Sequence, residues 1–263
     1  MKNPASLVRW DRFPLTSKYD PDWVVDNLMG PNALWLCESL CGSMALSPGM
    51  RVLDMGCGRA ATSIFLAREF GVTVWANDLW IAAADNWKRV REAGLESRVF
   101  PIRAEAHALP YADGFFDAIV SIDSYHYYGT SDTYLKYFVR FVKPGGQIGI
   151  VVPGFVRELT TVPPWLTKPR GGSDAFFDPS ECWSFHSAPW WRRHFERTGL
   201  VGIEEARLLK DGWRLWVRSE EARAAGGKME YPSEAPAIRA DRGRNIGFVQ
   251  MVARRRQVGP NPG

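Results

Sequence analysis

The stretch VLDMGCGRA, residues 52–60, decides how the chain folds, because it joins an apolar strand to a glycine turn. Three apolar residues surround Asp54 and suit a buried strand, and Gly56 and Gly58 follow at once. Glycines there let the backbone approach a ligand closely, while amide groups at the start of the next helix can face it. Asp54 does not suit a buried strand, since burying a carboxylate is costly unless something pairs with it. The stretch therefore predicts a ligand that brings a compensating charge.

The rest of the chain alternates between apolar runs of period two and apolar residues at helical spacing. Such alternation indicates consecutive βαβ units. We predict strands at 51–55, 72–77, 98–103, 116–122, 147–152, 203–209 and 246–254, and helices at 60–70, 81–93 and 132–141. The predicted fold class is α/β, a Rossmann-like doubly wound sheet that is mostly parallel, with a late antiparallel strand, an N-terminal helical lid and two irregular insertions.

Composition and charge exclude several classes of protein. The chain has 263 residues, 46% of them hydrophobic, and a net charge of +4. This balance is ordinary for a folded domain, and a charge spread along the chain does not indicate binding to nucleic acid. No apolar run is long enough to span a membrane and the start lacks a secretory signal, so we expect a cytoplasmic protein. The four cysteines lack the spacing of a zinc site, and we expect no metal.

Two ligand classes fit the glycine turn. Because Ala61 completes the pattern GxGxxA, a nicotinamide-dependent oxidoreductase is one of them. In such a fold the position of Asp54 is normally apolar, whereas a cationic ligand compensates for a carboxylate there. VLDMGCGRA resembles motif I of the class I S-adenosylmethionine-dependent methyltransferases, in which an acid and alternating glycines hold the cofactor. The resemblance implies that Asp54 meets the ammonium end of S-adenosylmethionine, directly or through water. The usual third glycine of the motif is Ala60 in this chain.

Further segments match the same family in order. Asp78 ends the second predicted strand in VWANDLW, where the resemblance implies that it accepts both ribose hydroxyls. AEAHALPYADGFFDAIVSID, residues 104–123, resembles the segment of the family in which Glu105 would accept from the adenine amino group. KPGG at 143–146 is similar to the LKPGG of the family. The resemblance covers about residues 50–152, and it gives these expected cofactor residues: Asp54, Gly56, Cys57, Gly58, Asp78, Leu79, Glu105, Ala106 and Asp123.

We expect one domain. Residues 1–49 would form the helical cap and 50–153 the cofactor-binding core, while 154–245 would hold substrate-side insertions and 246–254 the last strand. The insertions, at 154–188 and 211–245, are rich in Pro, Gly and Trp and lack periodicity. Their tryptophans either line a pocket or hold loops to the domain. Trp80 either contacts adenine beside Leu79 or belongs to the core.

The acceptor of the methyl group is expected near SIDSYHYYGT, residues 121–130, at the end of the fourth predicted strand. His126 is the leading candidate for a general base because imidazole titrates near neutral pH, and Tyr125 is a second candidate. Either side chain could instead shape the loop. The segment lacks the NPPY or DPPY sequence of enzymes that methylate nucleobase amines, so we expect no nucleic acid partner. Asp123 could touch the methionine end of the cofactor or the acceptor.

The sequence therefore favours a methyltransferase that acts on an O, N or C atom of a small molecule, with an aromatic or amine-bearing acceptor suggested by the tryptophans. A protein that binds the cofactor without catalysis is the second hypothesis, and a nicotinamide-dependent oxidoreductase is the third. Neither a membrane nor a nucleic acid is expected as a partner, and a homo-oligomer is left open.

Overall fold

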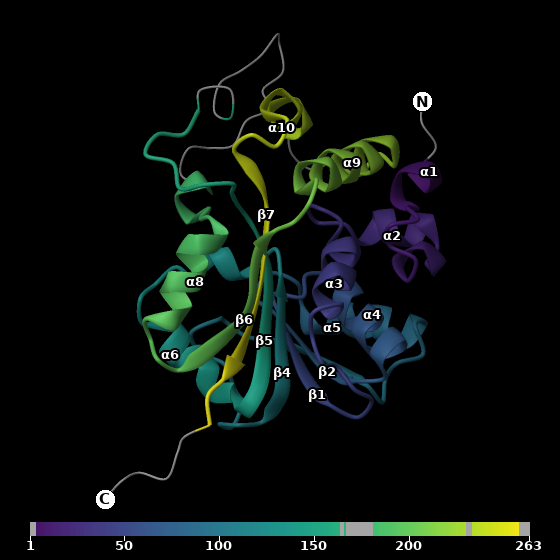
Figure 1. Ribbon diagram of the computed structural model, residues 1–263. Coiled ribbons are helices and arrows are strands. Elements are labelled where there is room, and N and C mark those ends of the chain that lie inside the picture. The colour runs from purple at the N-terminus through teal and green to yellow at the C-terminus, as the bar shows by residue number, and fades with distance from the viewer. Residues whose placement is uncertain (1–3, 164–165, 167–180, 230–232, 258–263) are drawn as a thin grey trace, which may run out of the picture.

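A computed structural model describes residues 4–163, 166, 181–229 and 233–257. Its centre is a seven-stranded sheet with the order β3-β2-β1-β4-β5-β7-β6 (Figure 1). The strands are β1 Arg51–Met55, β2 Thr73–Asp78, β3 Val99–Arg103, β4 Phe116–Ile122, β5 Val142–Phe155, β6 Val201–Leu208 and β7 Ile246–Arg255. The first five pair in parallel, and β7 runs antiparallel between β5 and β6. The predicted α/β class, a mostly parallel Rossmann-like sheet with a late antiparallel strand, is confirmed.

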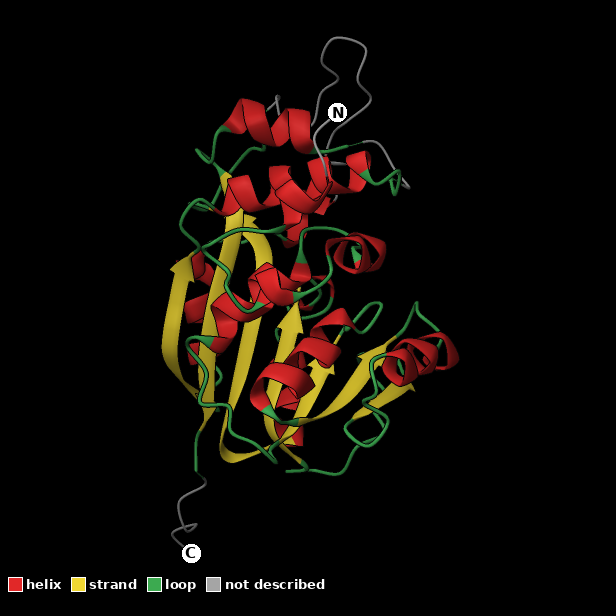
Figure 2. Ribbon diagram, turned by 90° about the vertical axis from the view of Figure 1, so that its right-hand side faces the viewer, coloured by secondary structure: helices red, strands yellow, loops and turns green. Residues whose placement is uncertain are grey.

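Helices cover both faces of the sheet and one of its ends (Figure 2). The α-helices are α1 Pro4–Val8, α2 Pro21–Asn27, α3 Ala33–Cys41, α4 Ala61–Phe70, α5 Ala83–Glu92, α6 Tyr134–Phe138, α8 Ala188–Glu196, α9 Gly212–Ala225 and α10 Ala235–Asp241. Short 3-10 turns are η1 Thr16–Lys18, η2 Tyr125–Tyr127, η3 Val139–Phe141 and η4 Glu181–Ser184. In Figure 1, α3, α4 and α5 lie on one side of the sheet, and α6 and α8 lie on the other.

The strands of the sheet are buried on both faces, as parallel strands usually are. Successive residues of a strand face opposite ways, so Val52 joins the apolar cluster under α3 and α4, whereas Leu53 joins the cluster under α6 and α8. Asp54 lies on the same face as Val52 and points toward α4. The alternation along β1 thus fixes which helix the buried carboxylate meets.

The predicted elements agree closely with the structure from β1 to β4, where each strand end lies within one residue of the prediction. The fifth strand is longer than predicted. It begins at Val142, so KPGG lies within its first half rather than in the turn before it. The predicted helix at 132–141 is α6 followed by η3.

The prediction that 211–245 is an irregular insertion is wrong. This segment forms α9 and α10, and α9 buries Leu215, Ser219, Ala222 and Arg223 on one face. Two of these side chains are polar, and a buried Ser219 and Arg223 break the apolar spacing by which a helix is identified in a sequence. In the first insertion, 154–188, residues 164–165 and 167–180 lie outside the described residues, and Trp165 is among them.

The N-terminal segment and α9 are fastened together although nearly the whole chain separates them. The Arg218 guanidinium donates to the carbonyl oxygens of Ser6, Leu7 and Arg9 at the end of α1. The next residue of α9, Ser219, accepts a hydrogen bond from the Asn32 N–H at 2.7 Å, just before α3. In Figure 2 these helices lie beyond the ends toward which the parallel strands point. Two adjacent residues of α9 therefore hold the cap at two places, residues 6–9 and Asn32.

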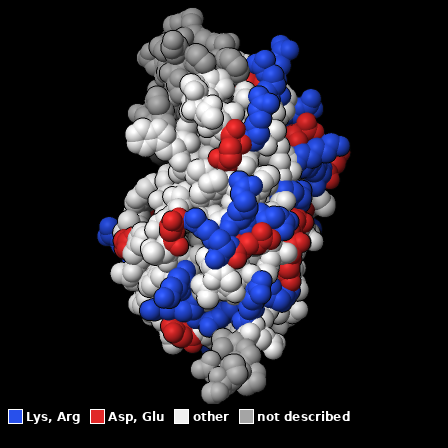
Figure 3. Space-filling model, turned by 60° about the vertical axis from the view of Figure 1, so that its left-hand side comes forward, with Lys and Arg blue, Asp and Glu red and all other residues white. Residues whose placement is uncertain are grey.

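Charged side chains of both signs alternate on the face shown in Figure 3. Ion pairs on α8 and its neighbours include Arg192 with Glu196 and Arg197 with Asp132. This face has no continuous basic patch of the kind that binds nucleic acid. Within the described residues, no helix is both long enough and apolar enough to cross a membrane.

Replacing Ser219 by Ala is expected to lower the free energy of unfolding by about 1–3 kcal/mol, because the buried Asn32 N–H loses its acceptor. Chemical denaturation measures the loss. Ser131→Ala serves as the matched control, since the Ser131 hydroxyl forms only an exposed contact with Thr133. Equal stability of the two variants would contradict the role of this bond in holding the cap.

Candidate functional site

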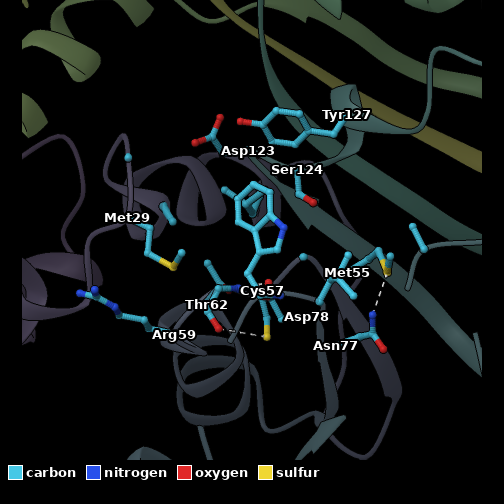
Figure 4. A pocket seen from close by; sticks show the side chains of 18 of the residues that line it. Met29, Met55, Cys57, Arg59, Thr62, Asn77, Asp78, Asp123, Ser124 and Tyr127 are labelled. Carbon is cyan, nitrogen blue, oxygen red and sulfur yellow. Dashed lines mark hydrogen bonds between the residues drawn. The ribbon is translucent and has the colours of Figure 1, made fainter. Parts of the chain in front are cut away.

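A pocket of about 350 Å³ lies at the carboxyl ends of β1, β2 and β4 (Figure 4). Open α/β sheets bind ligands at this edge, where the strand order reverses. The loops after the three strands supply most of the wall, and residues 29–31 of the cap close it from outside. All the predicted cofactor residues except Asp54 line the pocket.

The turn after β1 requires glycine at two positions. Gly56 has a φ of +75°, and a Cβ atom there would lie 1.9 Å from the Ser124 hydroxyl oxygen. Gly58 has a φ of +53°, and its Cβ would lie 2.8 Å from the Met29 sulfur. Ala60 is also left-handed, with a φ of +59°. An alanine costs about 1 kcal/mol in this conformation, which explains why the family usually has glycine where this chain has Ala60.

Asp54 is completely buried behind the turn. The hydroxyl groups of Thr62 and Ser63, in the first turns of α4, both donate to its Oδ2 at 2.6 Å. Its Oδ1 is buried without a hydrogen-bond partner. Thr62, which donates to Asp54, lines the pocket, whereas Asp54 itself does not. One oxygen is thus held by the protein, and the other lacks a donor.

Burial raises the pKa of Asp54 from 3.8 to about 6, although the two hydroxyl donors oppose that shift. The nearby carboxylate of Asp78 raises the pKa further. A cation or a donor at Oδ1 would stabilise the charged form and lower the pKa again. The unsatisfied oxygen therefore fits a ligand with an ammonium group, reached directly or through a water molecule.

Asp78 joins the turns after β1 and β2. Its Oδ2 accepts from the Gly58 N–H at 2.8 Å, and its Oδ1 accepts from the amides of Trp80 and Ile81 at 2.8 and 2.9 Å. A carboxylate has about four acceptor sites, so one remains on Oδ2 for a hydroxyl group of a ligand. The side chain that the sequence predicted for a ribose also shapes the glycine turn.

Glu105 lines the pocket after β3, together with Ala106 and His107. Its carboxylate accepts from the His107 N–H at 2.7 Å and lies 2.8 Å from the Nδ1 of that residue. The contact with His107 lowers the pKa of Glu105. Glu105 is therefore held as an anion at the rim of the pocket. The contact of Glu105 with His107 was not predicted from the sequence.

Asp123 lines the pocket directly after β4, with a left-handed backbone at a φ of +54°. Its backbone N–H donates to the Val151 oxygen at 2.7 Å. Burial raises the pKa of its carboxyl group from 3.8 to about 7. In Figure 4 Asp123 and Tyr127 lie across the pocket from Asn77 and Asp78.

Neither Tyr125 nor His126 is among the residues that line the pocket. The Tyr125 ring is buried against Trp191 and Phe195 of α8. Burial lowers the pKa of His126 from 6.5 to about 3, so its imidazole is neutral at neutral pH. The roles expected of these two side chains remain predictions.

Other residues complete the wall. Met29, Gly30 and Pro31 enter from the cap and were not singled out in the sequence. Tyr127 and Tyr128 enter from the loop after β4, where the sequence placed them either as wall or as part of the acceptor site. The Tyr128 hydroxyl lies 3.1 Å from the Ser124 hydroxyl and 3.2 Å from that of Ser121. Of the tryptophans in the two insertions, those described do not line this pocket. In the sequence, the glycine–proline pair of NLMGPN, residues 27–32, indicates a turn at this position.

The cysteines show no sign of reactivity. Cys57 lines the pocket, but burial raises the pKa of its thiol well above the usual value. Cys37 and Cys41 are buried with their sulfur atoms 3.9 Å apart. Within the described ranges, no group of three or more His, Cys, Asp or Glu residues could hold a metal ion.

Comparison with known proteins identifies the core. Residues 52–146 match the family model of a methyltransferase domain. The chain is 37% identical over 134 residues to methyltransferase GfsG of Streptomyces halstedii, covering 48% of this chain and 47% of that protein. It is 25% identical over 224 residues to erythromycin 3''-O-methyltransferase of Saccharopolyspora erythraea, covering 79% and 71%. The chain spans less than half the length of the first three curated relatives.

Solved structures share the fold at lower identity. Geranyl diphosphate C-methyltransferase from Streptomyces coelicolor A3(2), with Mg²⁺, geranyl diphosphate and S-adenosyl-L-homocysteine, has a TM-score of 0.65 at 20% identity, covering 84% of this chain and 78% of that one. The [4+2]-cyclase SpnF has a TM-score of 0.64 at 23% identity, covering 85% and 80%. A fold shared by proteins with these names does not by itself determine the reaction.

Gly56→Ala is expected to destabilise the protein by roughly 3 kcal/mol, since both the left-handed backbone and the contact with Ser124 become unfavourable. Gly94→Ala is the matched control, because Gly94 has a φ of +67° but nothing within 4 Å of its added Cβ. The control should cost about 1 kcal/mol. Denaturation curves that give the same loss for both variants would contradict the close packing of the turn.

The stability of the protein is expected to depend on the charge of Asp54. Because its folded pKa of about 6 exceeds the unfolded value near 3.8, the folded state binds the proton more tightly. The free energy of unfolding should therefore fall by about 2 kcal/mol from this group as pH rises from 4 to 6.

Asp54→Asn removes this titration. The difference in stability between the variant and the unaltered protein should grow in favour of the variant by about 2 kcal/mol across the same pH range. Denaturation at a series of pH values measures it. A constant difference between pH 4 and pH 7 would show that Asp54 is not desolvated as described.

Proposed function

We propose that this chain, in which residues 52–146 match the family model of a methyltransferase domain, transfers a methyl group from S-adenosylmethionine to a small molecule. The unsatisfied Oδ1 of the buried Asp54 carries this proposal, because it provides a place for the cationic amino-acid end of that cofactor. Eight further predicted cofactor residues around one pocket support it.

In the proposed complex the pocket divides into sections. Asp54 and the glycine turn would hold the amino-acid end of the cofactor. Asp78 would accept hydrogen bonds from the ribose, while Glu105 and Ala106 would meet the adenine. Leu79, whose side chain is 46% exposed, would cover one face of the base and shed that exposure. When bound, the sulfonium cofactor supplies an activated methyl group.

The residues of this chain contribute position and electrostatics. The carboxylates of Asp78, Glu105 and Asp123 face the pocket, and they favour a positively charged ligand. The cap residues Met29 and Gly30 close the pocket and keep water from the reacting atoms. Holding donor and acceptor in line accounts for much of the rate of a displacement reaction.

We further propose that the acceptor is a small molecule with an amine or aromatic group. Two exposed aromatic side chains at the pocket support this: Trp80 is 71% exposed and Tyr127 is 64% exposed, with ring centroids 6.0 Å apart. Exposed aromatic faces bind flat rings and cations. Relatives are named for transfer to nitrogen, oxygen and carbon, so the target atom must be inferred from this chain's own residues.

The same fold without methyl transfer is the second candidate. One observation favours it: a solved structure that covers 85% of this chain is named as a cyclase. Neither Tyr125 nor His126 lines the pocket, so these two candidate bases do not decide between methyl transfer and binding without transfer. Use of a nicotinamide cofactor is disfavoured because it leaves the buried charge of Asp54 without a partner.

Calorimetric titration with S-adenosylhomocysteine and with NAD is the test. We expect binding of the first and none of the second. Asp78→Ala should weaken binding of S-adenosylhomocysteine by about a hundredfold, because the ribose loses its acceptor and the glycine turn loses the bond to Gly58. Asp113→Asn is the control, since Asp113 is 72% exposed, pairs with Arg140 and lies outside the pocket.

Binding of NAD alone would contradict the proposed cofactor. If S-adenosylhomocysteine binds, incubation of the protein with methyl-labelled cofactor and a panel of amines, phenols, sugars and fatty acids separates an enzyme from a binding protein. Label in any acceptor supports catalysis. Tight cofactor binding without transfer to any member of the panel would favour the second candidate.

A further inference from the structure

The sequence left Asp123 open between the methionine end of the cofactor and the acceptor, and the other acidic side chains of the site already account for the cofactor. Asp54 and Asp78 would serve the amino-acid end and the ribose, and Glu105 would serve the adenine. Asp123 comes from a different strand, β4, and Figure 4 shows it with Tyr127 on the far side of the pocket from Asp78. This inference rests on the proposed function, because it depends on where the cofactor would lie.

The backbone holds the Asp123 carboxylate in the pocket at some cost. A non-glycine residue with a φ of +54° occupies a sparsely populated conformation, which is often found at functional sites. The turn is fixed by the bond from the Asp123 N–H to the Val151 oxygen. Its Oδ2 lies only 3.0 Å from where a Cβ of Gly30 would be, so the absence of a side chain at Gly30 makes room for it.

The carboxylate itself has no partner among the described residues. None of them donates a hydrogen bond to it or forms an ion pair with it, whereas Asp78 and Glu105 each accept from neighbouring groups. The half-buried side chain faces the cavity, and its partial desolvation raises the pKa to about 7. Such a group gains most from a ligand that brings a positive charge and a proton.

We propose that Asp123 is a catalytic residue on the acceptor side, which pairs with the ammonium form of an amine acceptor and takes one proton from it. The Tyr127 ring stands beside it in the same loop and would cover the bound cation. The substrate class is therefore a small primary or secondary amine, and the methylated atom is nitrogen.

The step balances in atoms and charge. An N–H bond of the ammonium breaks and its proton goes to the Asp123 carboxylate, which becomes neutral. The freed nitrogen lone pair forms the bond to the methyl carbon as the carbon–sulfur bond breaks. The electron pair of the broken carbon–sulfur bond stays on sulfur. The methylated nitrogen carries the positive charge that was on sulfur. The proton leaves Asp123 for solvent before the next turnover.

Binding of a probe amine tests this without turnover. The protein is saturated with S-adenosylhomocysteine at pH 8, and benzylamine and benzyl alcohol are titrated in separately by calorimetry. The two probes have the same ring and differ in charge. Asp123→Asn is the variant, because asparagine tolerates the left-handed backbone and keeps the shape of the side chain. Asp113→Asn is the control for loss of one distant negative charge.

We expect the unaltered protein and the control to bind benzylamine about tenfold or more tightly than benzyl alcohol, as a charge-assisted hydrogen bond should. Asp123→Asn should lose that preference while its affinity for S-adenosylhomocysteine changes by less than about threefold. A preference that survives in Asp123→Asn, or is absent from the unaltered protein, overturns the inference.

A second result would also overturn it. If Asp123→Asn weakens S-adenosylhomocysteine about as strongly as Asp78→Ala does, Asp123 belongs to the cofactor site and not to the acceptor. Failure of the proposed function looks different, because then the unaltered protein does not bind S-adenosylhomocysteine at all.

Discussion

The site depends on how one carboxylate is accommodated inside the protein. Asp54 lies at the end of a strand that is buried on both faces, where an apolar side chain would be more stable. Thr62 and Ser63 compensate for one oxygen and tie β1 to α4, while the other oxygen has no donor. Under the proposed function a cation would compensate this oxygen, and without one the buried charge lowers stability above the pKa of the group.

The remainder of the pocket is built from segments that are distant in the chain. Loops after three strands form the floor, and the cap supplies Met29–Pro31 as the outer wall. Helix α9 supports this wall. Arg218 donates to the Leu7 oxygen in α1, and Ser219 accepts from the Asn32 N–H just before α3. Helix α9 does not line the pocket, but through these hydrogen bonds it holds the cap residues that do.

The core of the fold could be predicted from the sequence because its signals are local. Each parallel strand is an apolar run bounded by turn residues, and Asp78 and Glu105 stand at the ends of such runs. Whether the side chains of Tyr125 and His126 face the pocket could not be predicted in the same way. The left-handed backbone at Asp123 and the 3-10 turn η2 set which side chains face the pocket, and neither follows from hydrophobic periodicity. Helix α9 was missed because its buried face includes Ser219 and Arg223.

A crystal structure of the protein with S-adenosylhomocysteine tests the central claim most directly. We predict density in the pocket after β1, with the amino group of the ligand hydrogen-bonded to Oδ1 of Asp54 or joined to it by one water molecule. Ligand density elsewhere, or an amino group with no path of hydrogen bonds to Asp54, would contradict the claim that this buried charge exists for the cofactor.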